Sequence, residues 1–148
     1  VNNNTTMSIA SGTDATNTTV DMRNNIVWDW FGGHGTLVWY GPQVNVVNNY
    51  YYSNGGDAVD ALIVCKGLND PDCVSDANNI AWAYTNGNFD ADGIDVNSEG
   101  NVGTPFPAPA LVVQDACTAA RQTLATAGVR PLDLIDQQYL SGITLIGC

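Results

Sequence analysis

The richest cluster of oxygen ligands in the sequence is the acidic run from Asp90 to Glu99. Asp90, Asp92 and Asp95 bring three carboxylates together at close spacing, and calcium takes several hard oxygen ligands of this kind. The run is not an EF-hand loop, because Gly93 comes too early for that motif. We predict calcium as a candidate cofactor that these three residues would bind. The simpler alternative is a solvated acidic turn.

Aromatic side chains suggest a second chemistry, the binding of sugars. Trp28, Trp30, Trp39 and Tyr40 surround a glycine-rich break in the chain, and the faces of sugar rings stack on such side chains. The alternative is that these rings pack against one another inside the fold. Arg23 could form a bidentate pair with a substrate carboxylate, or it could pair with Asp21 or Asp29 of its own chain. We predict Arg23 and the four aromatic residues as substrate-binding candidates.

No familiar catalytic constellation accompanies these residues. His34 is the only histidine and is flanked by glycines, which is typical of an exposed loop. The sequence has no nucleophile elbow with a Ser-His-Asp order, no glycine-rich phosphate loop and no CxxC pair. We therefore assign no catalytic residue from these motifs.

The charge balance excludes several partners. Fifteen acidic residues stand against four basic ones, which gives a net charge of −11. Phosphate backbones and anionic membrane surfaces require clustered Lys and Arg, so we expect neither nucleic acid nor membrane as a partner. The sequence has no apolar run of transmembrane length. Its 148 residues are enough for a single domain with a core.

Four cysteines indicate an oxidising compartment. Their spacing is unlike a zinc site, and an even number in a chain rich in Asn and Thr is typical of a secreted protein. Of the three pairings that four cysteines allow, we favour Cys65 with Cys73 and Cys117 with Cys148. N-x-[ST] sequons at Asn3, Asn4 and Asn17 are candidate glycosylation sites. The predicted location is extracellular.

A repeat of 24 residues predicts the elements that position these groups. Asn24-Asn25 returns as Asn48-Asn49, and each pair lies between short β-prone runs. This period, with no helix inside it, predicts stacked rungs of a β-solenoid. Asparagine accepts the left-handed conformation of a sharp corner, and stacked asparagines can bond along a ladder. The alternative is a turn dipeptide that occurs twice by chance.

The rest of the chain divides by composition. We predict one domain with five segments, in which the C-terminal helix runs from Asp115 to Ala127, a shorter helix follows at 134–140, and the apolar tail packs over the first helix and the last rung. The segments are a polar lead-in at 1–19, two rungs at 20–52, a cysteine-containing insertion at 53–78, a last strand with turns at 79–103, and an extended connector with helix and tail at 104–148.

At these residues the chain resembles the secreted pectate lyases. The phrases VDMRNNIVWDW and QVNVVNNYY resemble that family's RNNVIYNW and VNVVNNYY, which lie one rung apart. The strand AWAYTNGN and the ending AGVRPLDLID are similar to the family's last strand and C-terminal segment. The resemblance implies an all-β, right-handed parallel β-helix of about three rungs, with a C-terminal helix packed on it.

For function, the resemblance implies calcium-assisted β-elimination of an acidic polysaccharide. The family's calcium ligands and catalytic base precede the RNNVIYNW phrase, whereas the residues before Arg23 contain no Lys or Arg. We therefore assign no catalytic residue and expect this chain to be the C-terminal part of a longer β-helix, whose open first rung is covered by another chain or symmetry mate. The alternative is a secreted, non-catalytic β-solenoid that forms filaments or binds glycans.

Overall fold

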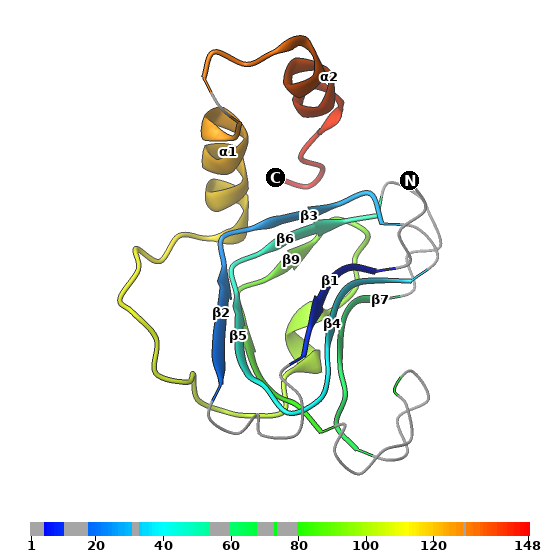
Figure 1. Ribbon diagram of the computed structural model, residues 1–148, viewed down its shortest axis with the longest axis vertical. Coiled ribbons are helices and arrows are strands. Elements are labelled where there is room, and N and C mark those ends of the chain that lie inside the picture. The colour runs from blue at the N-terminus through cyan, green and yellow to red at the C-terminus, as the bar shows by residue number, and fades with distance from the viewer. Residues whose placement is uncertain are drawn as a thin grey trace.

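The structure, a computed structural model, describes residues 5–10, 18–30, 33–53, 60–67, 73, 80–128 and 130–148. Nine strands form three sheets of three parallel strands each (Figure 1). Three consecutive strands, one from each sheet, make one rung. The first rung contains β1 (Thr5–Ile9), β2 (Thr19–Arg23) and β3 (Ile26–Trp28); the second contains β4 (His34–Val38), β5 (Gln43–Val47) and β6 (Tyr50–Tyr52); the third contains β7 (Asp60–Val64), β8 (Trp82–Asn86) and β9 (Phe89–Asp90).

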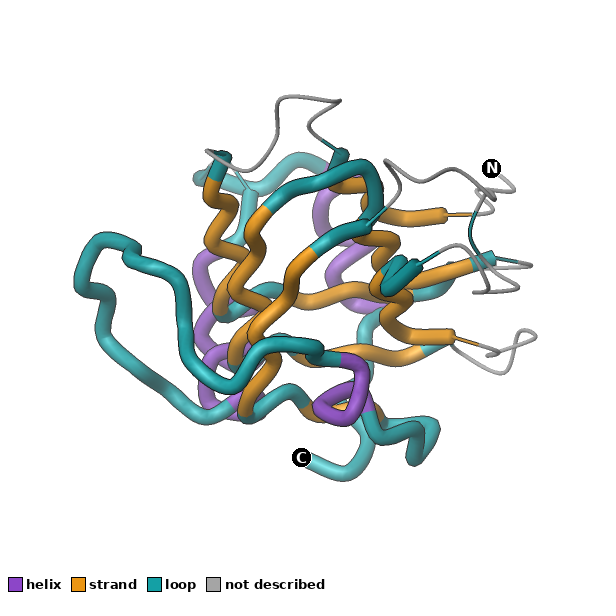
Figure 2. The backbone as a smooth tube through the Cα atoms, turned by 90° about the horizontal axis from the view of Figure 1, so that it is seen from below, coloured by secondary structure: helices purple, strands orange, loops and turns teal. Residues whose placement is uncertain are grey.

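Strands of successive rungs lie side by side in register. The sheets have the orders β1-β4-β7, β2-β5-β8 and β3-β6-β9, and the rungs are seen in profile in Figure 2. Val20 pairs with Val44, and Ile26 pairs with Tyr50, so the 24-residue sequence repeat is the distance between the first two rungs in these sheets. This architecture is mostly β, with parallel strands and two helices, and it is consistent with a parallel β-helix.

The polar lead-in and the cysteine-containing insertion each contain a strand. The polar lead-in contains β1, which pairs with β4, so the first rung begins before Val20. The predicted insertion contains β7, in which Ala61, Leu62, Ile63 and Val64 are buried. The apolar run before Cys65 is therefore a strand of the third rung, because its side chains continue the packing of β4.

The core lies between the sheets and consists mainly of aliphatic side chains. In β5, Val44 and Val46 are fully buried, while Gln43 lies on the other face. Tyr51 is also fully buried, and its ring meets that of Trp30 edge-on at 6.2 Å between centroids. Alternation along β5 thus directs one set of side chains inward, and stacking of rungs repeats the same inward positions.

The corner between β2 and β3 recurs in each rung, and we call it the ladder corner. Its first residue has a positive φ in all three rungs: 57° at Asn24, 54° at Asn48 and 66° at Gly87. Asparagine and glycine are the residues that adopt this conformation at least cost. The next residue in each rung is Asn25, Asn49 or Asn88.

Side chains at the ladder corner are joined along the stack. Asn25 donates from its backbone N and its Nδ2 to Oδ1 of Asn49, both at 3.0 Å. Asn49 donates in the same way to Oδ1 of Asn88, and Asn88 to Oδ1 of Asn97. The predicted ladder is therefore confirmed, and Asn97, in the 3-10 helix η2 (Val96–Glu99), is a further member.

The C-terminal part covers the outer face of the sheet β3-β6-β9. Helix α1 (Ala116–Thr126) begins at the N-cap Asp115, whose side chain accepts a hydrogen bond from the backbone N of Thr118 and whose pKa this bond lowers. Ala116, Ala119 and Ala120 are buried beneath the helix. The tail is fixed to the same face, because Tyr50 Oη donates to the carbonyl oxygen of Ile146 at 3.1 Å.

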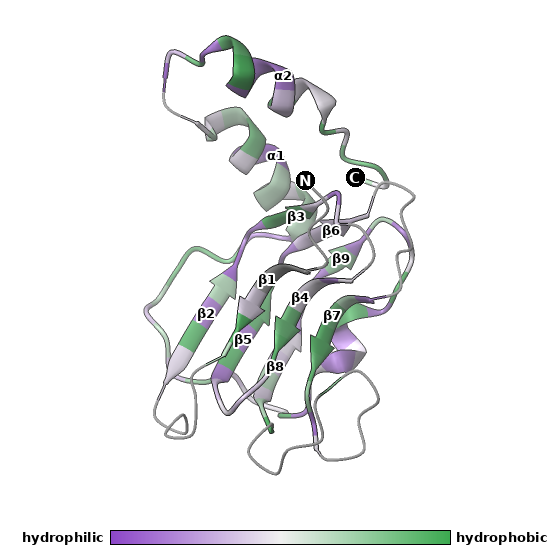
Figure 3. Ribbon diagram, turned by 45° about the vertical axis from the view of Figure 1, so that its right-hand side comes forward, coloured by the Kyte–Doolittle hydropathy of each residue, from purple (hydrophilic) through white to green (hydrophobic). Residues whose placement is uncertain are grey.

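The second helix differs from the prediction. Helix α2 (Leu134–Gly142) has no buried residue, and Leu134, Ile135 and Ile146 remain exposed at 83%, 64% and 43%. Part of α2 is coloured hydrophobic in Figure 3. The expectation that these tail residues pack over α1 and the last rung is therefore wrong, since α1 itself fills the space above β6.

Both disulfides have the favoured pairing, Cys65 with Cys73 and Cys117 with Cys148. The second bond joins the first turn of α1 to the last residue of the chain. Two disulfides are compatible with an extracellular protein. In the described part of the chain, neither helix is long and apolar enough to span a bilayer.

Candidate functional site

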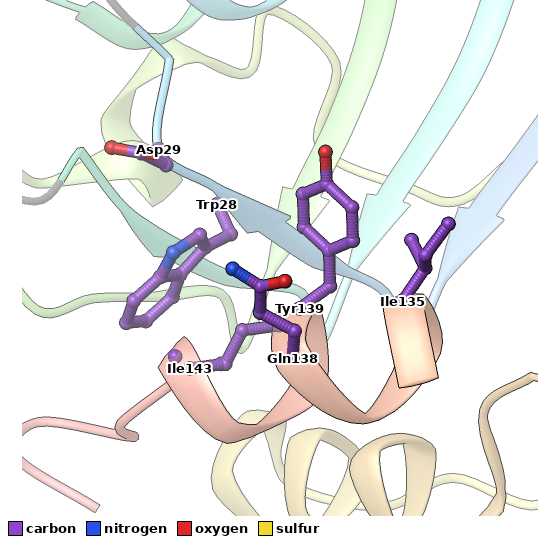
Figure 4. A pocket seen from close by; sticks show the side chains of 7 residues that line it. Trp28, Asp29, Ile135, Gln138, Tyr139 and Ile143 are labelled. Carbon is purple, nitrogen blue, oxygen red and sulfur yellow. The ribbon is translucent and has the colours of Figure 1, made fainter. Parts of the chain in front are cut away.

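A cleft of about 510 Å³ lies between the end of β3 and helix α2 (Figure 4). We call it the β3–α2 cleft. Two of its residues are aromatic, two are aliphatic and two carry polar side chains. Its lining consists of Trp28, Asp29, Ile135, Gln138, Tyr139, Gly142 and Ile143.

The floor of the cleft is set by two neighbouring strand ends. Trp28 is the last residue of β3, and its ring lies 4.7 Å from that of Tyr52, centroid to centroid, at an interplanar angle of 55°. Asp29 then turns the chain with a φ of 58° and donates its backbone N to the Tyr52 carbonyl oxygen. The half-buried indole is therefore supported by the next rung.

The opposite wall is one face of α2. Asp133 caps the helix by accepting a hydrogen bond from the backbone N of Asp136 at 2.8 Å. Ile135 and Tyr139 are four residues apart and therefore share a face of the helix. In Figure 4 the Gln138 amide lies between the rings of Trp28 and Tyr139. The wall thus presents an aromatic ring, an amide and a branched aliphatic side chain.

Few ionisable side chains line this cleft. Asp29 is the only ionisable side chain in the lining apart from the phenol of Tyr139. All four basic side chains of the protein are engaged elsewhere: Arg23 with Asp21, Lys66 with Glu99, Arg121 with the Cys148 carbonyl oxygen and Arg130 with the Ala125 carbonyl oxygen. The lining can stack on a ligand and hydrogen-bond to it, and it includes no Lys or Arg side chain.

The predicted substrate-binding residues do not form one surface. Trp28 lines the cleft, whereas Trp30 is only 1% exposed and belongs to the core. Trp39 and Tyr40 follow β4 at another corner, with ring centroids 4.8 Å apart. Trp30 is therefore wrong as a surface residue, because the chain after Asp29 directs its indole inward against Tyr51.

Arg23 pairs with an aspartate of its own chain, which was the alternative to binding a substrate carboxylate. Its Nε lies 2.7 Å from Oδ1 of Asp21, and both side chains are mostly buried. Oδ1 of Asp21 also accepts a hydrogen bond from Nδ2 of Asn45. A guanidinium held in this way is a structural group on the outer face of β2, away from the lining of the β3–α2 cleft.

His34 lies in a strand rather than in an exposed loop. It begins β4, is aligned with Asp60 at the start of β7, and has its Nδ1 3.9 Å from Oδ2 of Asp60. Strand pairing therefore accounts for its partner, and no nucleophile accompanies the pair in the structural description.

The three predicted calcium ligands are engaged separately. Asp95 caps η2 through the backbone N of Asn97, Oδ1 of Asp90 accepts from the backbone N of Asp92, and Oδ2 of Asp92 accepts from the backbone N of Ser53. Among the described residues, no three His, Cys, Asp or Glu side chains come together as a metal site. The spacing of Asp90, Asp92 and Asp95 therefore does not assemble them into a ligand set.

Asp90 is unusual for a different reason. It is aligned with Tyr51 in the sheet, so its side chain points into the interior. Burial, helped by the nearby Asp92 carboxylate, raises the pKa of Asp90 to about 6, although the bond from the Asp92 amide opposes the shift. The third rung therefore has a carboxyl group where the first has Val27.

The predicted glycosylation sites were not placed by the structure, and three residues that line the cleft were not predicted from the sequence. Asn3, Asn4 and Asn17, the candidate glycosylation sites, lie outside the described residues. Ile135, Gln138 and Tyr139 were not predicted as site residues, because the short helix was expected to be packed. The signal that would have found them is the i, i+4 pair of Ile135 and Tyr139 on a helix whose partner surface was already supplied by α1.

Comparison with protein-family models, with curated proteins and with solved structures found no match for this chain. The resemblance to pectate lyases therefore depends on the sequence phrases and on the arrangement of the strands.

Proposed function

We propose that this chain is the C-terminal solenoid part of a secreted, pectate lyase-like protein that acts on acidic polysaccharide by β-elimination. In this proposal the fold is a right-handed parallel β-helix, and the catalytic rungs with any calcium they require lie outside the chain. The chain itself contributes stacked rungs and a surface for binding the polymer. The observation that carries the proposal is the open end of the asparagine ladder.

The ladder has a direction, and its two ends differ. Each member accepts at Oδ1 the two N–H groups of the preceding rung, and Asn97 ends the series by donating from Nδ2 to the Asn88 carbonyl oxygen. At the first rung, the series of ladder bonds begins with Asn25 as a donor, and Oδ1 of Asn24 is buried without a partner among the described residues. A further rung with an asparagine at its corner would continue the series beyond Asn25.

The neighbouring surface also favours further rungs. Leu111, Val112 and Val113 are consecutive and are exposed at 53%, 79% and 73%. Leu111 and Val112 border a second hollow of about 430 Å³ that also involves Asn24 of the first rung. Apolar side chains gathered at one place on a surface are typical of an interaction site. A stack that continued beyond β2 and β3 would cover them.

The engaged basic side chains support the proposal that catalysis takes place on other rungs. β-Elimination needs a base beside the substrate carboxylate, and each of the four basic side chains already has a partner within this chain. With a net charge of −11, the chain repels a polyanion unless a divalent cation bridges them. Any binding of polygalacturonate should therefore depend on calcium.

A direct test uses the 148-residue chain alone with polygalacturonate. We expect no unsaturated product at any calcium concentration. We also expect retardation in gels that contain the polymer and calcium, and loss of that retardation with chelator. Turnover by the purified chain would contradict the absence of catalytic rungs, and unchanged mobility in calcium would contradict polymer binding.

The second candidate function is a non-catalytic secreted solenoid that binds glycans or forms filaments. The engaged basic side chains favour its non-catalytic character. Its filament form is less well supported, because the ladder ends at Asn97 in η2 and a head-to-tail copy would meet that closed end. The sequence encoded upstream of Val1 separates the candidates: a rung with paired aspartates and an arginine would favour the lyase, and a signal peptide alone would favour the binding protein.

A further inference from the structure

We infer that the β3–α2 cleft binds an uncharged pyranose segment of a polysaccharide, in preference to a free uronate segment. The inference rests on the proposed function for the kind of polymer, but it concerns a site that lies away from any catalytic rung. It is carried by the size of the cleft, by the aromatic and amide groups that line it and by the charge around it.

The size and shape of the cleft suit a short stretch of a sugar chain. Its volume of about 510 Å³ falls within the range of roughly 300–1,000 Å³ found for small-molecule sites. Ile135 and Tyr139 on the α2 wall are 64% and 75% exposed, so the cleft is open to solvent along that wall. A polymer can therefore enter it without a chain end.

Two aromatic rings and an amide supply the recognition groups. Trp28 is held from below by Tyr52, so it forms a preorganised platform. Tyr139 is 75% exposed and lies on the opposite wall. The C–H faces of pyranose rings pack on such apolar surfaces, whereas their hydroxyl groups need donors and acceptors of the kind that the Gln138 amide provides.

The walls are fixed relative to each other, although α2 buries no side chain. Beyond α2, the tail is tied to the body by the Cys117–Cys148 bond and by the bond from Tyr50 to Ile146. Before α2, the guanidinium of Arg130 donates a hydrogen bond to the carbonyl oxygen of Ala125 in α1. Connections on both sides hold α2 across from β3, so the cleft is not merely the space around a detached helix.

Charge decides between an uncharged and an acidic sugar. No Lys or Arg lines the cleft, and Asp29 is part of it. A uronate carboxylate placed here would meet no Lys or Arg of the lining as a counter-charge, and an uncompensated charge removed from water is unfavourable. Methyl esterification removes the charge of the uronate and keeps its ring, so an esterified segment fits where the free acid does not.

The test compares one polymer in two charge states. Affinity electrophoresis in chelator would use highly methyl-esterified galacturonan and the same polymer after saponification. We expect the esterified polymer to retard the chain and the saponified polymer to leave it unaffected. Tyr139→Ala should weaken retardation roughly tenfold, the equivalent of ~1.4 kcal/mol, whereas Tyr139→Phe should retain it because the ring remains.

Trp82→Ala is the matched control, since Trp82 is a half-exposed aromatic residue at the start of β8 and outside the lining of the cleft, and binding by this variant should equal that of the wild type. Tyr139 is mostly exposed, so its replacement should leave the unfolding midpoint unchanged. Equal retardation of wild type and Tyr139→Ala, or stronger retardation by the saponified polymer in chelator, would overturn the inference. The first result would leave the calcium-dependent binding by which the proposed function is tested unaffected, whereas the second would also contradict the calcium dependence of that binding.

Discussion

The two ends of the sheet β3-β6-β9 differ in regularity. At the ladder corner, which precedes these strands, every rung has a positive-φ residue followed by an asparagine whose side chain is bonded to the next rung. At the other end, which we call the variable corner, the chain leaves β3, β6 and β9 in three different ways. There Trp30 Nε1, Ser53 Oγ and Asp90 Oδ2 are buried without partners among the described residues.

We infer from this difference that the ladder corner is the scaffold and that the variable corner can carry a binding site. The ladder corner bonds its asparagine side chains through repetition, with Oδ1 of Asn24 in the first rung as the exception among the described residues, and this repetition leaves little freedom for change. The variable corner has no such constraint, and the β3–α2 cleft begins there with Trp28 and Asp29. A stacked fold can therefore hold its rungs together at one corner and vary its surface at another.

The largest expected effect is the loss of the central ladder residue. Asn49 is fully buried, accepts both N–H groups of Asn25 and donates to the Met22 carbonyl oxygen and to Asn88. Asn49→Ala should lower the free energy of unfolding by about 4 kcal/mol, because several buried groups lose their partners at ~1–3 kcal/mol each. Urea unfolding measures this loss.

Asn25→Ala is the matched variant, since Asn25 stands at the open end of the ladder and is only partly buried. It should cost roughly half as much as Asn49→Ala. Equal losses from the two variants would show that the ladder does not stabilise the corner through bonding along the stack.

The second effect concerns the turn residue of the third rung. Gly87 has a φ of 66°, and a Cβ placed there would lie 2.0 Å from Oδ1 of Asn48. Gly87→Ala should therefore destabilise the protein by about 2–3 kcal/mol through backbone strain and the clash. Gly103→Ala is the control, because a Cβ at that position meets nothing within 4 Å. A loss in the control as large as that at Gly87 would contradict this explanation.

The third effect is a pH dependence at the variable corner. Because the pKa of Asp90 is raised in the folded state to about 6, the folded protein holds the proton more tightly than the unfolded chain. The contribution of this group is therefore most favourable below the unfolded pKa and is lost as the pH rises through about 4 to 6. Stability should decline over this window and change little above it.

Asp90→Asn removes the buried charge and keeps the side-chain oxygen that accepts from the Asp92 amide. It should stabilise the protein by about 1 kcal/mol at pH 8, less than the full linkage value because solvent still screens the carboxylate. The gain should vanish near pH 4. Thermal unfolding across this range would measure it, and a pH-independent gain would contradict the assignment.

Repetition also explains which parts of the structure could be predicted from the sequence. The recurrence of Asn24-Asn25 at Asn48-Asn49 predicted the ladder because the same local conformation returns in each rung. The N-cap at Asp115 predicted the start of α1 within a residue, since capping depends on a few neighbouring residues. Local rules were sufficient at both places.

The cleft could not be predicted in this way. Trp28 and Tyr139 are far apart in the sequence and meet only because the tail returns to the first rungs. Trp30 likewise meets Tyr51 of the next rung in a contact that no repeat specifies. Asn97 joined the ladder from a helix rather than from a strand, so the period did not reveal it.

The most direct test of this separation is a backbone NMR titration of the chain with short methyl-esterified galacturonan oligomers in chelator. The account predicts that amide shift changes concentrate at Trp28, Asp29, Gln138 and Tyr139, while the amides of Asn49 and Asn88 stay unmoved. Shift changes centred on the ladder corner, with none at the cleft, would contradict it.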